Sequence, residues 1–174
     1  MRRLLLLRHA KAVPTTGRHD FERALVERGR RDAERVGAFV AEAGLIPDLI
    51  VFSAAARTRE TATLVLKAWP RPVAMLSEPA LYDASRAGLQ AIVRALPAAS
   101  ASVMLVGHNP GVAELALSLA GRGAKSDMLR LAGKFSTSAL AVLEFDADDW
   151  REASAGAARL ARFVTPDDLS VASD

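Results

Sequence analysis

The feature of the sequence that most restricts its fold is a run of four leucines, residues 4–7, which ends at Arg8 and His9. A short, continuous apolar run is typical of a strand covered on both faces, as in a parallel sheet. Arg8 breaks the run too early for the apolar region of a signal peptide, and no run approaches the roughly 18 apolar residues of a membrane span. We therefore expect a cytoplasmic chain with no membrane segment.

Short apolar runs alternate with helical periodicities along the chain. Besides the strand at 3–7, strands are predicted at 48–53, 73–77, 102–107, 138–145 and 158–164. Helices are predicted at 21–43, 56–69, 85–96 and 111–120, with ends near a Gly or a Pro in several cases. This alternation favours an α/β fold with a mostly parallel central sheet. The pattern leaves open whether the final strands run antiparallel at an edge.

Composition narrows the class of protein further. The 174 residues, 51% hydrophobic and 25% charged, fit one domain over 1–174 with ample core material. The absence of cysteine excludes disulfides, thiolate metal sites and a cysteine nucleophile. The arginines of residues 18–35 alternate with Asp and Glu, as on a solvated helix face, so the net charge of +3 does not indicate a nucleic-acid partner.

Chemically informative residues follow the predicted strands. The first strand ends at Arg8 and His9, the second leads to Arg57, and the fourth leads to His108. Ligands of open α/β sheets bind beyond the carboxyl ends of the strands, so these four side chains are predicted to meet at one rim. Two guanidinium groups can hold a phosphoryl group, one imidazole can attack phosphorus, and a protonated imidazole can donate to the phosphoryl oxygens. Because nearby cations lower an imidazole pKa, His9 is expected to be neutral.

Several segments, in order, resemble the histidine phosphatase (phosphoglycerate mutase-like) superfamily, and within it the bacterial SixA-type phosphohistidine phosphatases. The segments are Leu-Leu-Leu-Arg8-His9-Ala10, Asp20-Phe-Glu-Arg23, Ser53-Ala-Ala-Ala-Arg57-Thr58, Pro79-Ala-Leu81-Tyr82 and Val106-Gly107-His108-Asn109-Pro110-Gly111. The resemblance runs from residue 4 to about residue 145. It departs from many members at Ala10, where they have Gly, so the loop here must use an ordinary backbone conformation.

The resemblance implies a three-layer α/β/α sandwich and a phosphatase that uses neither metal nor organic cofactor. His9 would be the nucleophile, Arg8 and Arg57 the phosphate clamps, and His108 the second histidine of the pocket. The preferred substrate would be phosphohistidine on a protein, such as a phosphotransfer domain or carrier. A phosphatase of small phosphomonoesters or nucleotide-derived compounds remains an alternative, which a proton donor at Glu78 or Asp83 would favour. A non-catalytic phosphate-binding or docking module is a third.

Other polar and aromatic residues receive structural interpretations. Asp20 and Arg23 are predicted to pair and brace the loop after the first strand, and Ser53 to bond Arg57 or cap the next helix. Arg57 could instead pair with Glu60, and His108 could be a turn residue. His19 is predicted to be solvated. Packing roles are predicted for Trp69, Tyr82 and Trp150, and a solvated loop is predicted around Gly121, Gly123, Lys125, Arg130, Gly133 and Lys134.

Overall fold

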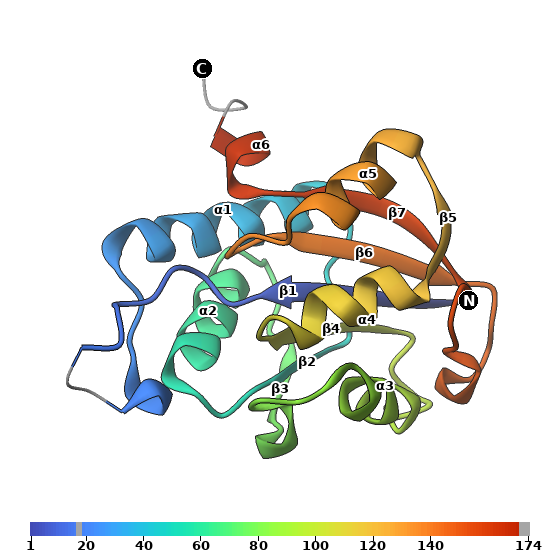
Figure 1. The fold of residues 1–174 in the computed structure, drawn as a ribbon, viewed down its shortest axis with the longest axis horizontal. Helices are drawn as coiled ribbons and strands as arrows, with labels where there is room; N and C mark the ends of the chain where they lie inside the picture. The colour runs from blue at the N-terminus through green and yellow to red at the C-terminus, as the bar shows by residue number, and fades with distance from the viewer. Residues whose placement is uncertain (17–18, 171–174) are drawn as a thin grey trace.

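A single mixed sheet forms the centre of the computed structural model, which describes residues 1–16 and 19–170. Its strand order is β3-β2-β4-β1-β6-β7-β5 (Figure 1). The strands are β1 (Arg2–Arg8), β2 (Leu49–Phe52), β3 (Ala74–Ser77), β4 (Ser102–Gly107), β5 (Ala120–Gly123), β6 (Leu140–Phe145) and β7 (Ala158–Val164). Strand β6 alone is antiparallel to the others, and it lies inside the sheet rather than at an edge.

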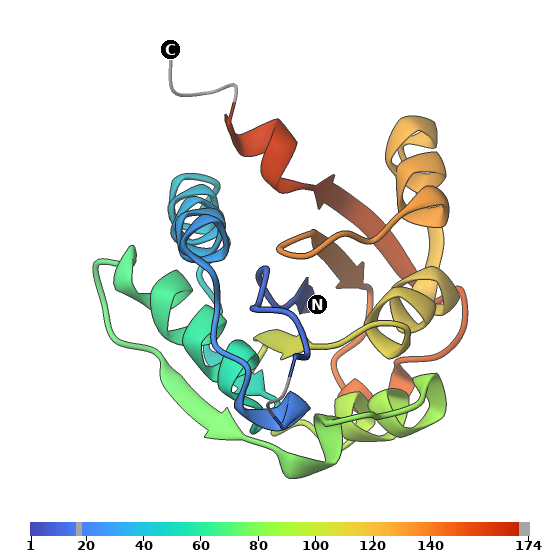
Figure 2. The ribbon, with the colours of Figure 1, turned by 60° about the vertical axis from the view of Figure 1, so that its left-hand side comes forward.

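Helices cover both faces of the sheet (Figure 2). They are α1 (Glu27–Glu42), α2 (Ala56–Lys67), α3 (Arg86–Arg94), α4 (Gly111–Leu119), α5 (Lys125–Gly133) and α6 (Pro166–Ser170), with 3-10 turns η1 (Asp20–Glu22), η2 (Pro79–Leu81) and η3 (Trp150–Glu152). Residues of α1 and α2 share one apolar core with the sheet, and residues of α3, α4 and α5 share the other. The predicted α/β/α sandwich with a mostly parallel sheet is confirmed.

The four leucines of β1 explain why the sheet has a core on each side. Leu4 and Leu6 belong to the core under α3–α5, whereas Leu5 and Leu7 belong to the core under α1 and α2. All four are fully buried. Successive side chains of a strand point to opposite faces, so only a continuous apolar run suits a strand that is covered twice.

The prediction of a helix at 21–43 was wrong for the residues before Glu27, where α1 begins. Ala12 and Leu25 form an antiparallel bridge, which keeps residues 23–26 extended between η1 and α1. Phe21, the first residue of the predicted helix, is 41% exposed. The helix ends as predicted, since Gly44 follows with a φ of 67°, which glycine adopts without strain.

The prediction of a solvated loop around Gly121–Lys134 was also wrong, because β5 and α5 occupy this region. In addition, the short helix α6 was not predicted. Strand β5 pairs in parallel with β7 at the sheet edge. A Cβ at Gly121 would lie 2.0 Å from the backbone oxygen of Gly156. Glycine at this position therefore allows the two backbones to approach closely. The glycines of this segment are also typical of a loop, which is why a loop was predicted.

Replacement of Gly121 by Ala is expected to destabilise the protein by about 1–3 kcal/mol, since the backbone of Gly156 cannot yield as a flexible side chain would. Urea denaturation measures this difference. Gly133→Ala is the matched control, because a Cβ there meets nothing within 4 Å at the end of α5. Equal stability of the two variants would contradict this account of β5.

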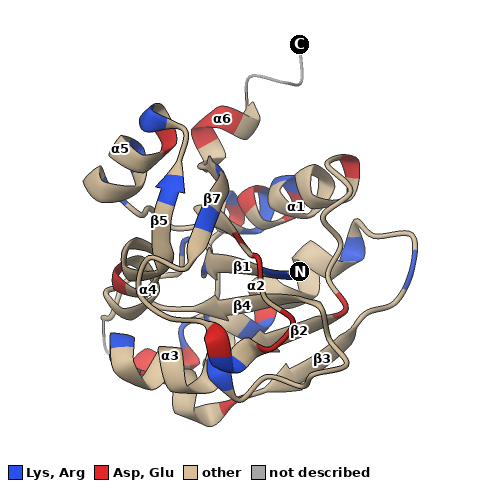
Figure 3. Cartoon of the chain, turned by 90° about the vertical axis from the view of Figure 1, so that its right-hand side faces the viewer, with Lys and Arg blue, Asp and Glu red and all other residues tan. Residues whose placement is uncertain are grey.

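Charged residues are mixed in sign over the side of the molecule drawn in Figure 3. Across neighbouring strands, Arg3 lies opposite Glu144, and Glu144 lies opposite Arg159. The carboxylate of Glu144 forms ion pairs with both arginines. Arg3 and Arg159 therefore share one acidic neighbour. Among residues 1–16 and 19–170, no helix is long and apolar enough to cross a membrane.

Candidate active site

Two parallel strands, β1 and β4, bring the two predicted pocket histidines together. The register places Arg8 opposite Gly107, so His9 and His108 follow on adjacent strands. The amide of His9 donates to the Gly107 carbonyl at 3.0 Å. The two imidazole centroids are 5.3 Å apart, and their planes are inclined at 55°. The predicted meeting of these side chains at the carboxyl ends of the strands is confirmed.

The ring of His9 is oriented by the backbone of the next residue. Its Nδ1 lies 2.7 Å from the Ala10 carbonyl oxygen, which can only accept a hydrogen bond. In the neutral ring, Nδ1 therefore carries the proton and Nε2 carries the free electron pair. Ala10 has no positive φ, its amide donates to Thr61 Oγ1 at 3.0 Å, and its methyl group is buried. Alanine thus fits this loop in an ordinary conformation, as expected.

The pKa of His9 is lowered to about 3, so the ring is neutral near pH 7. Burial is the first cause, and the bond to Ala10 opposes it. The charges of His108, Arg57 and Arg8 lower the pKa further. The sequence predicted the neutral state from the arginines alone, whereas loss of water around the ring contributes more.

His108 forms a hydrogen bond that the sequence did not indicate. Its Nε2 lies 2.8 Å from the Ser53 hydroxyl, and its Nδ1 is buried without a partner among the described residues. Burial, followed by the charge of Arg57, lowers the pKa of His108 to about 4, and the nearby carboxylate of Asp20 opposes the shift. Ser53 follows β2 directly, so its place after a strand was a usable signal. A phosphate dianion bound beside this ring would raise its pKa.

The two arginines each keep one buried donor free. Arg8 donates from Nη1 to the Phe135 carbonyl at 3.0 Å, and Arg57 donates from Nη1 and Nη2 to the backbone oxygen and carboxylate of Asp20 at 2.7 and 3.0 Å. The Nε atoms of both arginines are buried and have no partner among residues 1–16 and 19–170. Buried donors without partners are rare in proteins because each costs about 1–3 kcal/mol. Because the charges of Arg8 and Arg57 both act on His9, these two donors suit an anion bound at that ring.

Asp20 joins the loop after β1 to the rest of the pocket. Its carboxylate accepts from Tyr82 Oη at 2.7 Å, Arg23 Nε at 2.9 Å and Arg57 Nη2 at 3.0 Å. The bond from Tyr82, followed by those from Arg23 and Arg57, holds the pKa of Asp20 well below its usual range, although burial opposes this. The predicted pairing of Asp20 with Arg23 is confirmed. Arg57 pairs with Asp20 and not with Glu60, which binds Arg30 instead.

Tyr82 belongs to the pocket, so its predicted role in packing alone was incomplete. Its ring lies edge-on to His108 at 5.6 Å, and the guanidinium of Arg57 lies 6.0 Å from its centroid. The bond to Asp20 raises the pKa of its phenol. Its position in the segment that follows β3 was the available signal. The packing roles of Trp69 and Trp150 are confirmed, since both rings are buried and donate to backbone carbonyls.

The two carboxylates predicted as proton donors lie just before and just after η2. Glu78 accepts the amide of Ala80 at 2.9 Å and caps η2, whereas Asp83 is exposed with a φ of 53°. Within the described residues, no hydrogen bond or ion pair joins either carboxylate to Arg8, His9 or His108. A role for either as an acid therefore stays a prediction. His19 is exposed in a loop, as predicted.

The pocket so described has the groups of an enzyme that transfers phosphoryl groups. They are a neutral imidazole with a free Nε2, a second imidazole 5.3 Å from it between centroids, the buried guanidinium of Arg57 and the half-buried one of Arg8. Residues 4–85 match the family model of the histidine phosphatase superfamily (branch 1). An uncharacterised chloroplastic protein of Arabidopsis thaliana is 33% identical over 184 residues, which cover 95% of this chain and 78% of that protein. This chain therefore belongs to the histidine phosphatase superfamily.

Solved structures place the chain near the SixA-type members of that superfamily. The crystal structure of a proposed phosphohistidine phosphatase SixA from Agrobacterium tumefaciens is 32% identical, with a TM-score of 0.78 over 95% of this chain and 98% of that one. A second proposed SixA, from Nakamurella multipartitia, is 26% identical, with a TM-score of 0.81 over 95% and 96%. Membership of the superfamily supports phosphatase activity.

The depressed pKa values of His9 and His108 predict a pH-dependent stability. Unfolded histidines titrate near pH 6.5, so the unfolded chain binds more protons than the folded chain below that pH. The free energy of unfolding is therefore highest above about pH 6.5. It decreases as the pH falls toward about 4, the pKa of folded His108, and about 3, the pKa of folded His9. Each histidine contributes up to about 1.4 kcal/mol per pH unit to the slope of the unfolding free energy.

Urea denaturation between about pH 5 and about pH 6.5 tests this slope above the range where most carboxylates titrate. His108→Asn is expected to remove about half of the slope. His19→Asn, which changes an exposed imidazole, is expected to retain it. An unchanged slope in His108→Asn would show that His108 is not neutralised by burial.

Proposed function

We propose that this protein hydrolyses phosphohistidine on another protein, with His9 as the transiently phosphorylated nucleophile. The observation that carries the proposal is the bond from His9 Nδ1 to the Ala10 carbonyl, because it leaves Nε2 unprotonated and oriented. The charges of His108, Arg57 and Arg8 all act on this ring. Each of those residues has a buried nitrogen that finds no partner among the described residues: Arg8 Nε, Arg57 Nε and His108 Nδ1. A pocket that only bound phosphate would have no need of a neutral, oriented imidazole.

The reaction takes place in two displacements at phosphorus. In the first, His9 Nε2 forms a bond to phosphorus while the bond from phosphorus to the substrate imidazole breaks, and its electron pair stays on that imidazole. Donors of Arg8, Arg57 and His108 stabilise the negative charge on the phosphoryl oxygens. In the second, water attacks phosphorus, the bond to Nε2 breaks, and phosphate and a proton are released.

The carboxylates around the pocket favour a nitrogen leaving group over an alkoxide. An alkoxide needs a proton as it leaves, whereas an imidazole whose other nitrogen is already protonated leaves as a neutral ring. Asp20 is ionised at neutral pH and engaged by three donors, so it has no proton to give. Glu78 is engaged as the cap of η2. The similarity to the two SixA structures also favours a phosphorylated protein, such as a phosphotransfer domain or carrier in the cytoplasm.

Three substrates separate the proposal from its alternatives: a phosphohistidine protein, an aryl phosphate and an alkyl phosphate. The expected order of kcat/KM is phosphohistidine first, the aryl ester second and the alkyl ester last, because the need for a proton increases in that order. A preference for an alkyl ester would overturn the proposal and favour the phosphatase of small phosphomonoesters. A fall of alkyl ester hydrolysis alone in Glu78→Gln or Asp83→Asn would identify a proton donor.

Turnover of none of the three, with phosphate still bound, would leave only the non-catalytic phosphate-binding module. Hydrolysis of an alkyl ester that Glu78→Gln and Asp83→Asn leave unchanged would exclude both carboxylates as the donor. The substrate comparison therefore tests the reaction, its leaving group and its acid separately.

A further inference from the structure

A polar groove that the proposed reaction does not use lies beside the catalytic pocket. It consists of two adjoining cavities of about 190 and about 250 Å³, which share Lys134, Ser136 and Asp167. The first is lined by Lys11, two residues of α1, Lys134, Ser136, Thr137 and the start of α6, and the second extends it past Arg130 to Thr165. In Figure 2, α1, α6 and the segment that follows α5 lie on the upper side of β1. We call this feature the 134–137 groove.

Backbone contacts connect the 134–137 groove with the nucleophile. Lys11 follows His9 by two residues. The amide of Ser138, which ends the loop of the groove, donates to the carbonyls of Arg8 and His9 at 3.2 Å each. Arg8 in turn donates to the carbonyl of Phe135 at 3.0 Å. When the phosphohistidine of a substrate protein reaches His9, the residues that flank this phosphohistidine must lie over the rim of the pocket. The 134–137 groove is part of that rim.

Charge in the groove is in positive excess. Lys11 and Lys134 are exposed and form no ion pair within the described residues. Arg28 is a third cation, and its side chain is 64% exposed. Its one ion pair within the described residues is a long one, 3.8 Å from the guanidinium Nε to the Asp32 carboxylate. Asp32 is almost completely buried, whereas Asp167 is exposed. These three cations therefore face two carboxylates, of which only Asp167 is open to solvent.

The other charged and polar groups of the groove leave this excess unchanged. Arg130 is engaged by Asp127 and Asp168. Asp32 also contacts Arg35, at 3.4 Å, outside the lining of the groove. Ser136 and Thr137 add two hydroxyl groups that form no side-chain hydrogen bond in the part of the chain that the structure describes. Ammonium and hydroxyl donors together suit a carboxylate.

We propose that the 134–137 groove binds an acidic segment adjacent to the phosphohistidine of the substrate protein, with Lys11 and Lys134 as its main contacts. This inference rests on the proposed function and specifies which protein substrates are preferred. Charges at a rim contribute chiefly to encounter and selectivity, so they change kcat/KM more than the chemical step. The phosphoryl pocket itself does not require the groove.

Two synthetic phosphohistidine peptides test the groove. They differ only in flanking residues, which are Asp and Glu in one and Asn and Gln in the other. The wild-type protein is expected to prefer the acidic peptide about tenfold in kcat/KM at low salt, and the preference is expected to shrink as salt is added. Lys11→Glu and Lys134→Glu are each expected to lower the preference about fivefold, while aryl phosphate turnover stays within about twofold of wild type.

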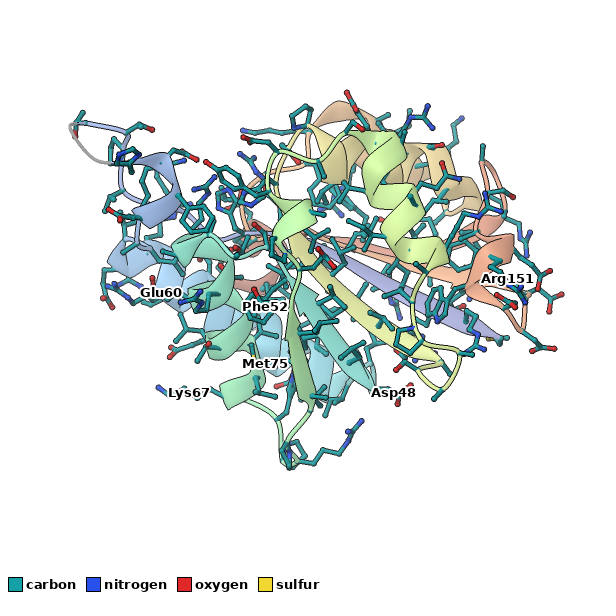
Figure 4. All side chains as sticks on the ribbon, turned by 90° about the horizontal axis from the view of Figure 1, so that it is seen from below. Asp48, Phe52, Glu60, Lys67, Met75 and Arg151 are labelled. Carbon is teal, nitrogen blue, oxygen red and sulfur yellow. The ribbon has the colours of Figure 1, made fainter. Side chains whose placement is uncertain are left out.

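The chain provides matched controls at its two other lysines. Lys67 projects from α2 (Figure 4), and Lys125 begins α5, and neither lines the groove. Lys67→Glu and Lys125→Glu make the same change of charge and are expected to retain the preference. Equal effects of all four substitutions, or no preference in the wild type, would overturn the groove but not the phosphatase. If neither peptide is hydrolysed while an aryl phosphate is, the proposed function fails and the groove assignment fails with it.

Discussion

Replacement of His9 by Ala is expected to lower kcat for every phosphorylated substrate by about 10⁴-fold or more, because no other group replaces the attacking nitrogen. His9 Nε2 is the free nitrogen of a ring fixed by the Ala10 carbonyl. The substitution also removes a buried ring, so the unfolding midpoint is measured in parallel to show that the variant is folded. Initial rates of phosphate release give the loss.

His19→Ala is the control for a histidine near the pocket in sequence, since His19 is exposed and is expected to leave the rate unchanged. Trapping adds a second readout. Denaturation during turnover is expected to yield labelled protein whose phosphate is lost in acid and kept in alkali, as a phosphoramidate is. Full activity in a folded His9→Ala variant, or a label that survives acid, would show that another residue is the nucleophile.

The central part of the sheet was predictable because its strands have a local signature. A strand covered on both faces must be apolar at every position, and Leu4–Leu7 and Val103–Val106 meet that requirement with full burial. Parallel pairing then makes the residues that follow these strands neighbours. The convergence of His9 and His108 therefore follows from two short runs of sequence and one rule of topology.

The remainder of the pocket depends on contacts that no local pattern encodes. Tyr82 and Asp20 lie 62 residues apart in the sequence, and a hydrogen bond joins them only because η1 and η2 flank the same rim. The bond from Ser53 to His108 spans 55 residues. Hydrophobic periodicity reports which face of an element is buried, but it is silent on which polar groups will meet across elements. These contacts were therefore missed although each residue lies in a segment that resembles the family.

Edge elements were missed for a different reason. Strand β5 has the sequence Ala-Gly-Arg-Gly, without the branched or aromatic residues that identify most strands. It forms because β7 offers a partner and because Gly121 allows close approach to Gly156. Tertiary pairing thus overrides local propensity at the edge of the sheet, where the predicted loop was wrong.

The pocket concentrates positive charge and hydrogen-bond donors at some cost in stability. Burial depresses the pKa of both histidines, and the structure compensates only part of the charge on Arg57, through Asp20. A phosphoryl dianion supplies the missing negative charge and the missing acceptors together. The donors of Arg8 and Arg57 are therefore suited to the oxygens of a phosphoryl group.

Replacement of Arg57 by Ala is expected to lower kcat/KM by about 10²–10³-fold, the usual effect of removing one preorganised donor to a developing charge. Arg57 is buried, its Nε has no partner in the part of the chain that the structure describes, and its charge lowers the pKa of both pocket histidines. The matched control is Arg59→Ala, two residues along α2, where the side chain is exposed and donates only weakly to the Ala54 carbonyl at 3.5 Å. Arg57→Lys keeps the charge but not the planar group, and is expected to recover only part of the loss.

Equal rates in Arg57→Ala and Arg59→Ala would mean that the guanidinium of Arg57 serves only to hold Asp20. A loss confined to stability, with kcat/KM unchanged per folded molecule, would lead to the same conclusion.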